Sequence, residues 1–176
     1  LQWKVDWAMR WMAFGVDYEM CGKDLTESVD LASKICKAVG KKSPVNLIYE
    51  MFLDEKGEKI SKSVGNGISV DQWLRYGSPE SLSLFMYQKP KSAKKLFFDV
   101  IPKTVDEYIS HCNSYDRLED HKKFDSPVWH IHSGKQINFK SDITFNSLTN
   151  LVSICNTSDK NIIWGFINQY DASINP

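Results

Sequence analysis

The sequence lacks a net charge, a long apolar run and any closely spaced pair of cysteines. Its 22 basic and 22 acidic residues cancel, so nucleic-acid binding would need a local basic cluster rather than an overall positive field. No apolar run approaches the roughly 20 residues of a membrane-spanning helix. The first residues, 1–4, do not follow a signal-peptide pattern. We therefore expect a cytoplasmic protein with no membrane partner.

Metal-ligand patterns are also scarce. The four cysteines, at positions 21, 36, 112 and 155, are widely spaced, which is a poor disulfide framework and a poor zinc site. They are interpreted as reduced thiols. His130 and His132 could share one face of a strand, as a metal pair would, but no Cys or carboxylate stands at ligand spacing. A loop or structural role is favoured for both histidines, and no metal site is expected.

The residues that are present suit a folded chain. The 176 residues are 42% hydrophobic and 12% aromatic, which is enough to bury a core in one domain or two small ones. The sequence begins at Leu1 rather than Met and stops at Pro176 just after a helical pattern. We expect it to be part of a longer chain.

The first part of the sequence predicts an α/β unit. Residues 1–23 are rich in tryptophan and glycine. A helix is expected from a capping-box-like start at Asp24–Glu27 to a stop at Gly40, with apolar residues at helical spacing between them. Residues 46–53 predict a buried strand, and 54–57 a polar turn. A helix followed by a buried strand is typical of α/β folds.

The rest of the sequence predicts helices. One begins at Val70, and another has Ser78 as N-cap, Pro79 at its first position and an end before Pro90. A third is expected near Pro102. Residues 116–142 look like a connection. Two closing helices carry apolar residues over 145–155 and 163–170, the second with Ser158 as its cap. The predicted fold class is α/β followed by all-α.

One loop has a composition suited to chemistry. Lys59-Ile60-Ser61-Lys62-Ser63 combines two ammonium groups and two hydroxyls, and Gly65 and Gly67 follow it. Such a loop suits a polyphosphate, whose charge the lysines neutralise while hydroxyls and backbone N–H groups donate hydrogen bonds. The alternative is a solvated lysine-bearing loop. The order of strand, turn, loop and glycines favours the phosphate interpretation.

The same loop resembles the KMSKS motif of class I aminoacyl-tRNA synthetases, with Ile60 in place of Met. The sequence around it resembles the bacterial branch of the class I lysyl-tRNA synthetases, and the resemblance covers essentially the whole chain. The segments that carry it are Lys4–Trp11, Gly22-Lys23-Asp24, Tyr49-Glu50, Ser81–Met86 and Asp99–Lys103. The loop indicates only the class, whereas the tryptophan-rich block indicates lysine as the amino acid.

The resemblance implies a domain layout. Residues 1–69 would be the second part of the Rossmann-like catalytic domain with its KMSKS loop. Residues 70–115 would be a helical stem-contact region, and 116–176 the start of a helical anticodon-binding domain. None of the four histidines stands in the family's HIGH pattern or precedes the loop. We therefore expect the N-terminal half of the same enzyme to be a missing partner of this segment.

The resemblance also implies the reaction. The substrates would be lysine, ATP with Mg²⁺ as its counter-ion, and tRNA(Lys), with no tightly bound cofactor in this segment. Lys62 would contact the ATP phosphates most directly, and Lys59, Ser61 and Ser63 would assist. These groups stabilise charge on the departing pyrophosphate, and closure of the loop would gate the chemistry.

A lysine pocket is expected near the tryptophan block. Trp3 and Trp7 could line the aliphatic stem of the substrate, and Asp6 could bind its ammonium group. The alternatives are that the tryptophans belong to the core and that Asp6 pairs with Arg10 one helical turn on.

Gly22 and Asp24 are also expected near the lysine pocket. Tyr49 could reach it from its strand, although burial in the core is the favoured role for that residue. Many relatives have His after Gly-Lys-Asp, whereas this chain has Leu25. No histidine role is therefore transferred to that position.

A basic cluster is a candidate tRNA contact. Its members are Lys89, Lys91, Lys94 and Lys95, followed closely by Phe97 and Phe98. Contact with the phosphate backbone near the acceptor stem and a solvated lysine-rich turn are both compatible with this pattern. Two functional hypotheses remain: the second part of a lysine–tRNA ligase catalytic domain, or a non-catalytic tRNA-binding piece from a split or decayed gene, inactive alone.

Overall fold

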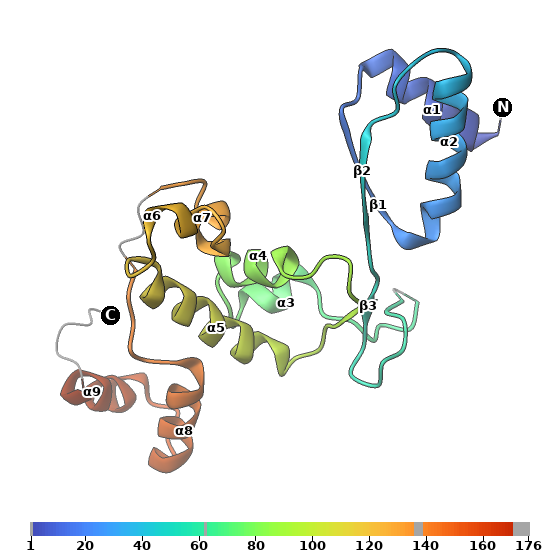
Figure 1. Cartoon of the computed structure of the whole chain (residues 1–176). Coiled ribbons are helices and arrows are strands. Elements are labelled where there is room, and N and C mark those ends of the chain that lie inside the picture. Colours follow the sequence, from blue (N-terminus) through green and yellow to red (C-terminus); the bar gives the residue numbers. More distant parts are fainter. Residues whose placement is uncertain (1, 62, 136–138, 171–176) are drawn as a thin grey trace. The chain divides into compact units, whose positions relative to one another are not determined.

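The computed structural model describes residues 2–61, 63–135 and 139–170. The chain divides into two compact units (Figure 1). The first comprises residues 1–67 and 89–97, and the second comprises residues 68–88 and 98–176. Each unit therefore contains segments that are separated in the sequence.

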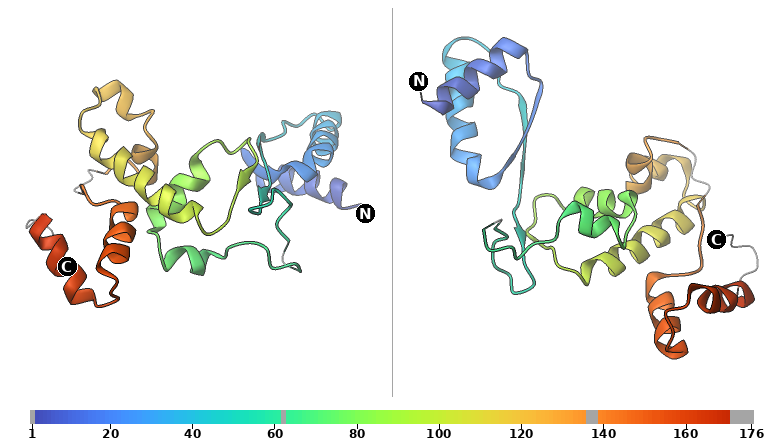
Figure 2. Two further views of the ribbon diagram at one scale, coloured as in Figure 1. Left: turned by 90° about the horizontal axis from the view of Figure 1, so that it is seen from below. Right: turned by 180° about the vertical axis from the view of Figure 1, so that it is seen from behind.

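The first unit begins with two helices packed beside a pair of parallel strands. Its elements are α1 (Trp3–Phe14), β1 (Tyr18–Gly22), the 3₁₀ turn η1 (Lys23–Leu25), α2 (Thr26–Ala38) and β2 (Val45–Tyr49). The register of β1 and β2 runs from Tyr18 opposite Val45 to Gly22 opposite Tyr49. The helix α2 is the crossover connection that parallel pairing requires, and both views in Figure 2 show it beside α1.

The core of this unit lies between the two helices and the strands. Its buried residues are Ala8, Trp11, Cys21, Val29, Ala32 and Cys36. The predicted helix over 24–40 is confirmed as α2, but the predicted capping box is wrong. Leu25 is the N-cap, and the Thr26 hydroxyl donates to Lys23 O at 2.6 Å instead of capping the helix. The tryptophan block is itself a helix, α1, which was not predicted.

The predicted buried strand over 46–53 is divided in the structure. The strand β2 ends at Tyr49, and a separate strand β3 (Phe52–Leu53) pairs in parallel with β4 (Lys94–Lys95). Glu50 N donates to Pro90 O at 2.9 Å, so the chain changes its pairing partner at this point. The strand is also less buried than predicted, since no residue of β2 or β3 is fully buried.

The second unit is helical. Its elements are α3 (Val70–Leu74), α4 (Pro79–Tyr87), α5 (Val100–Tyr115), α6 (Asp120–Lys123), α7 (Pro127–Ile131), α8 (Phe145–Cys155) and α9 (Lys160–Tyr170). The core contains Leu84, Tyr108, Cys112, Tyr115 and Val128. The helices predicted near 70, 79, 102, 145 and 163 are confirmed, including Ser78 as N-cap of α4 and Pro79 at its first position.

Two local predictions in this unit are wrong. Residues 116–142 are not only a connection, because they contain α6 and α7. The structural role favoured for His130 and His132 is confirmed: His130 lies in α7, where its Nε2 is 2.9 Å from Phe124 O, and His132 Nε2 is 2.9 Å from the Tyr108 hydroxyl. The residue that accepts from the start of α9 is Asp159, whose Oδ1 lies 2.9 Å from Asn161 N, rather than Ser158.

The fold class is therefore mixed α/β with small parallel sheets and many helices. The division at residues 69 and 115 stays a prediction. All four cysteines are free, as predicted. Within the described ranges, no helix combines the length and the apolar character needed to cross a membrane.

Candidate functional site

The lysine-bearing loop projects from a short hairpin. Leu53 forms an antiparallel bridge with Lys59, and Asp54 N donates to Glu58 O at 2.8 Å across the predicted turn. Gly57 closes the turn with a φ of 88°, which favours glycine. Lys59 therefore stands at the end of the returning segment, where the loop begins.

The loop turns sharply after this point. Ser61 O accepts hydrogen bonds from Val64 N at 3.2 Å and from Gly65 N at 2.9 Å. The hydroxyls of Ser61 and Ser63 are hydrogen-bonded at 2.8 Å, so two of the predicted site residues lie side by side. Lys62, another predicted site residue, lies outside the described residues. The structure thus brings together the two hydroxyls of the loop.

Lys59 is joined to the turn that follows β1. Its Nζ lies 2.8 Å from Asp24 Oδ2, and both side chains are more than half exposed. The hydrogen bond from Lys59, and then its charge, lower the pKa of the Asp24 carboxyl. Two motifs far apart in the sequence, Lys59–Ser63 and Gly22–Asp24, therefore meet through one ion pair.

A cavity lies next to this turn. Its volume is about 290 Å³, and its lining residues are Lys23, Asn46, Ile48, Tyr49, Glu50 and Lys91. Lys23 and Glu50 form an ion pair of 3.0 Å beside it. Asn46 Oδ1 is buried and is without a hydrogen-bond partner in the described part of the chain. Tyr49, which is 39% exposed, faces this space rather than the core.

The tryptophan side chains of α1 lie in a row along the helix, and their exposure decreases from Trp3 to Trp11. Trp3 is 51% exposed, whereas Trp11 is 3% exposed. The ring centroids of Trp3 and Trp7 are 5.6 Å apart, and those of Trp7 and Trp11 are 4.9 Å apart. The Trp11 indole N–H donates to Glu19 Oε2 at 2.8 Å. Trp11 thus belongs to the core, Trp7 is partly buried and packs against the core as its alternative role had it, and Trp3 remains accessible.

Asp6 is engaged within the same helix. Its Oδ2 lies 2.8 Å from Arg10 Nε, which is the pairing considered as the alternative to ammonium binding. Any role of Asp6 toward a substrate would have to compete with Arg10.

The four clustered lysines have different environments. Lys94 and Lys95 form β4. Lys94 Nζ lies 5.7 Å from the centroid of the Phe52 ring, and burial lowers its pKa. Lys95 Nζ donates to Glu55 O at 2.8 Å. Lys89 is exposed, and Lys91 lines the cavity. These two lysines are therefore less involved in holding the fold together than Lys94 and Lys95.

Asp54 and Asn66 are site residues that the sequence did not single out. Asp54 is 8% exposed, and its carboxylate accepts from Asn66 Nδ2 at 2.8 Å. Asp at a turn and Asn among glycines are ordinary turn residues, so composition alone gave no signal for this contact.

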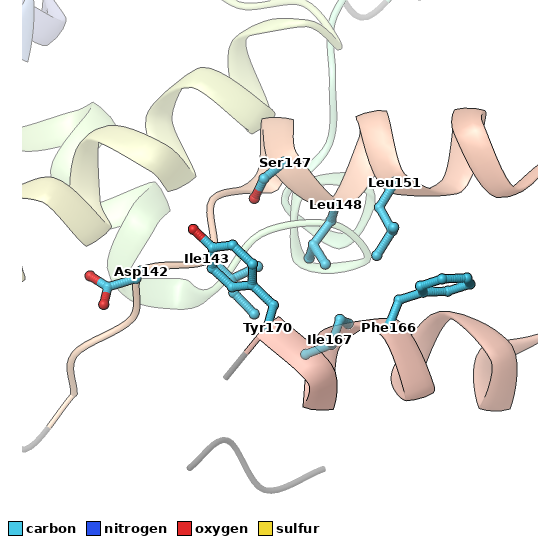
Figure 3. A pocket seen from close by; sticks show the side chains of 8 residues that line it. All are labelled: Asp142, Ile143, Ser147, Leu148, Leu151, Phe166, Ile167 and Tyr170. Atoms are coloured by element: carbon cyan, nitrogen blue, oxygen red, sulfur yellow. The ribbon is translucent and has the colours of Figure 1, made fainter. Parts of the chain in front are cut away.

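A second hollow lies between α8 and α9. Figure 3 shows Leu148 and Leu151 of α8 facing Phe166 and Ile167 of α9. The groove between them has a volume of about 290 Å³. The remaining lining residues are Asp142, Ile143, Ser147 and Tyr170. Neither helix has a buried residue, so the apolar faces of this hairpin stay accessible. In the residues the structure covers, no cluster of three or more His, Cys, Asp or Glu side chains could hold a metal ion.

Comparison with known proteins places these features in a family context. Residues 1–135 match the family described as tRNA synthetases class I (K). The whole chain is also similar to proteins named lysine–tRNA ligase. It is 55% identical to that of Rickettsia peacockii, and 56% identical to those of Rickettsia bellii and Rickettsia akari. The chain spans 34% of the length of each of these relatives.

Proposed function

Because the chain belongs to the family of class I (K) tRNA synthetases, we propose that it forms part of an enzyme that activates lysine with ATP and transfers it to tRNA(Lys). The names of its relatives support lysine as the amino acid. The observation that carries the proposal is the 2.8 Å contact between Lys59 and Asp24. It joins the loop suited to phosphate to the turn that resembles the family's substrate-binding segment.

In the proposed first step, a carboxylate oxygen of lysine attacks the α-phosphorus of ATP. The bond to the bridging oxygen breaks, and pyrophosphate leaves with the electron pair and with Mg²⁺ as its counter-ion. Lys62 binds the departing phosphates, and Lys59, Ser61 and Ser63 assist. Cations and hydroxyls placed in advance stabilise the charge that develops on this group.

Lys59 would exchange partners during this step. The ion pair with Asp24 is well exposed, and exposed ion pairs contribute little to stability. The ammonium group can therefore leave Asp24 for a phosphate at small cost. In the resting site, the contact keeps Lys59 at the entrance of the loop.

The lysine substrate is proposed to bind near the carboxyl ends of β1 and β2, where parallel sheets hold their ligands. Gly22 is the last residue of β1, and Asp24 follows two residues later. Tyr49 is the last residue of β2 and is paired with Gly22 at the same edge. Trp3 has the exposure that a contact with the aliphatic stem requires. The competing bond to Arg10 makes Asp6 the weaker candidate.

tRNA is proposed to contact Lys89 and Lys91, with Lys94 and Lys95 mainly holding β4 in place. The proposed layout is a catalytic part over 1–69, a helical stem-contact region over 70–115 and the start of a helical anticodon-binding domain at 116. The apolar groove between α8 and α9 supports the last assignment, because a further helix of such a domain would cover it.

The alternative is a tRNA-binding piece without catalytic activity. One observation favours it for the isolated 176 residues: none of the four histidines stands in a HIGH pattern. In the family, the histidines of the HIGH motif act on the phosphates of ATP from the side opposite the KMSKS loop.

Lysine-dependent ATP–pyrophosphate exchange tests both proposals. It should be measured with tRNA(Lys) present, on the 176-residue chain and on a ligase of the relatives' length that contains it. We expect exchange from the long chain and none from the short one. An inactive long chain would contradict the enzymatic proposal, and an active short chain would show that the HIGH half is dispensable.

A further inference from the structure

We propose that Asp54 and Asn66 are positioning residues for the ATP-binding loop, which they hold closed at its base. This inference rests on the proposed function, because it assigns these residues a role in ATP use. It differs in kind from the roles of Lys59–Ser63, since neither Asp54 nor Asn66 is placed against a substrate.

Asn66 joins the two ends of the loop. Its Oδ1 accepts a hydrogen bond from Ser61 N at 3.0 Å. Its Nδ2 donates to Asp54 Oδ2 at 2.8 Å and to Lys59 O at 3.4 Å. An amide side chain offers a donor and an acceptor at once, so a single residue at the loop exit fixes both the carbonyl and the N–H of residues at its entrance.

Asp54 anchors this arrangement to the hairpin. Its Oδ1 accepts from Glu58 N at 2.8 Å, while its Oδ2 accepts from Asn66. The hydrogen bond from Asn66 is the largest cause, ahead of that from Glu58, of the lowered pKa of this carboxyl. A nearly buried carboxylate needs such donors to offset the loss of its hydration. Asp54 therefore stays ionised in its position and holds the Asn66 amide in one orientation.

The exit of the loop lies tightly against its entrance. A Cβ added to Gly67 would stand 2.5 Å from Cγ2 of Ile60, so a larger residue would force the Ile60 side chain or the backbone to shift. Glycine at position 67 thus lets the outgoing chain pass Ile60 while Asn66 keeps its hydrogen bonds to Ser61, Asp54 and Lys59. The base is closed by contacts that leave the side chains of Lys59 and Ser63 exposed.

A closed base matters because the proposed chemistry relies on placing cations in advance. A loop fixed at both ends loses less conformational freedom when it closes over a ligand. Displacement of catalytic groups by about 1 Å can cost about a hundredfold in rate. The loss of the Asn66 bonds is therefore expected to impair the use of ATP, with little effect on the affinity for free lysine.

The experiment compares four variants in a ligase of the relatives' length: Asn66→Ala, Asn66→Asp, the double exchange Asp54→Asn with Asn66→Asp, and Lys56→Ala. Lys56 is exposed in the same turn, so its replacement is the matched control. Pyrophosphate exchange gives kcat and KM for ATP and for lysine. Thermal unfolding reports whether each variant is folded.

Asn66→Ala should lower kcat/KM for ATP by roughly tenfold to a hundredfold, with KM for lysine unchanged. Its unfolding midpoint should fall, because Asp54 loses a donor, while the variant stays folded at the assay temperature. Asn66→Asp places two carboxylates against each other, which raises the pKa of one of them. Its activity relative to the parent should therefore recover as the pH falls. The double exchange restores a donor opposite a carboxylate and should regain most of the loss, whereas Lys56→Ala should match the parent.

Three results would overturn the positioning role: parental kcat/KM for ATP in folded Asn66→Ala, an equal loss toward lysine and ATP, or a double exchange no better than Asn66→Asp. An inactive parent enzyme would instead contradict the proposed function. Amide hydrogen exchange distinguishes failure of the positioning role from failure of the proposed function, because it does not require an active enzyme. Ser61 N–H should exchange faster in Asn66→Ala whether or not the enzyme is active, and an unchanged rate would show that Asn66 does not hold the loop.

Discussion

Lys59 Nζ lies 2.8 Å from Asp24 Oδ2, which makes the first lysine of the loop and the last residue of Gly22–Asp24 an ion pair. The hydrogen bond and charge of Lys59 hold the pKa of the Asp24 carboxyl below its usual range. In Lys59→Gln, this pKa should rise toward the ordinary value of about 3.9. A carbon-detected NMR titration of Asp24 measures the change. The same pKa in both proteins would mean that the contact does not form in solution.

The stability of the folded protein should depend on pH through the ionisation of Asp54. Its pKa is lowered in the folded protein, so its contribution to stability is present above its unfolded pKa and is lost as the pH falls through the folded value. Asp54→Asn should therefore be less stable than the parent near neutral pH, and the difference should shrink below about pH 4. Urea denaturation at several pH values measures it. A difference that does not change with pH would argue against an ionised Asp54.

Lys62→Ala should separate chemistry from tRNA binding. In a ligase of the relatives' length, removal of this cation should lower the rate of lysine activation by roughly a hundredfold or more. The affinity for tRNA(Lys) should be nearly unchanged, because the loop is proposed to act on the phosphates of ATP. Pyrophosphate exchange and filter binding measure the two effects, and Lys42→Ala is a control at an exposed lysine of the same unit. An unchanged exchange rate would remove Lys62 from the mechanism.

Trp11→Phe tests the core of the first unit. Trp11 is 3% exposed and donates to the Glu19 carboxylate at 2.8 Å. Phenylalanine keeps most of the packing but leaves the carboxylate without this donor. Such a bond to a charged group contributes about 1.5–3 kcal/mol, and a loss of that order is expected in chemical denaturation. A variant as stable as the parent would show that water replaces the indole N–H without cost.

Two glycine substitutions should have opposite effects in the second unit. A Cβ on Gly77 would lie 2.8 Å from Trp73 Nε1 and 2.9 Å from Ser81 Oγ, which are themselves hydrogen-bonded at 3.1 Å. Gly77→Ala should cost about 1–3 kcal/mol. A Cβ on Gly165 of α9 meets nothing within 4 Å, so Gly165→Ala should stabilise the helix by about 0.5–1 kcal/mol. Thermal unfolding of both variants measures the contrast, and destabilisation of equal size would contradict it.

The helices of the second unit were predictable because their signals are local. Ser78 and Pro79 define the start of α4 within two residues, and the apolar spacing of residues 145–155 defines α8. In α1 the tryptophans recur every four residues, at 3, 7 and 11, but the aromatic and glycine content of the segment obscured that period. The short helices α6 and α7 were missed because four or five residues carry little periodicity.

In the candidate site too, some features could be predicted from the sequence and others could not. The residues of the loop were identifiable from composition and resemblance, because two ammonium groups and two hydroxyls within five residues indicate phosphate binding without knowledge of the tertiary structure. The partners of those residues were not identifiable. Asp24 meets Lys59, and Asp54 meets Asn66, through contacts that no sequence spacing defines.

The sequence by itself determined the family, the positions of most helices and the residues with which the loop can bind a phosphate. Only the tertiary structure decided that the predicted strand over 46–53 divides between two sheets, that Lys59 is paired with Asp24, and that Asn66 closes the base of the loop. The physical reason is the range of the interactions. A helix is stabilised by hydrogen bonds between residues four apart, whereas strand pairs, ion pairs and side-chain clamps depend on how distant segments pack.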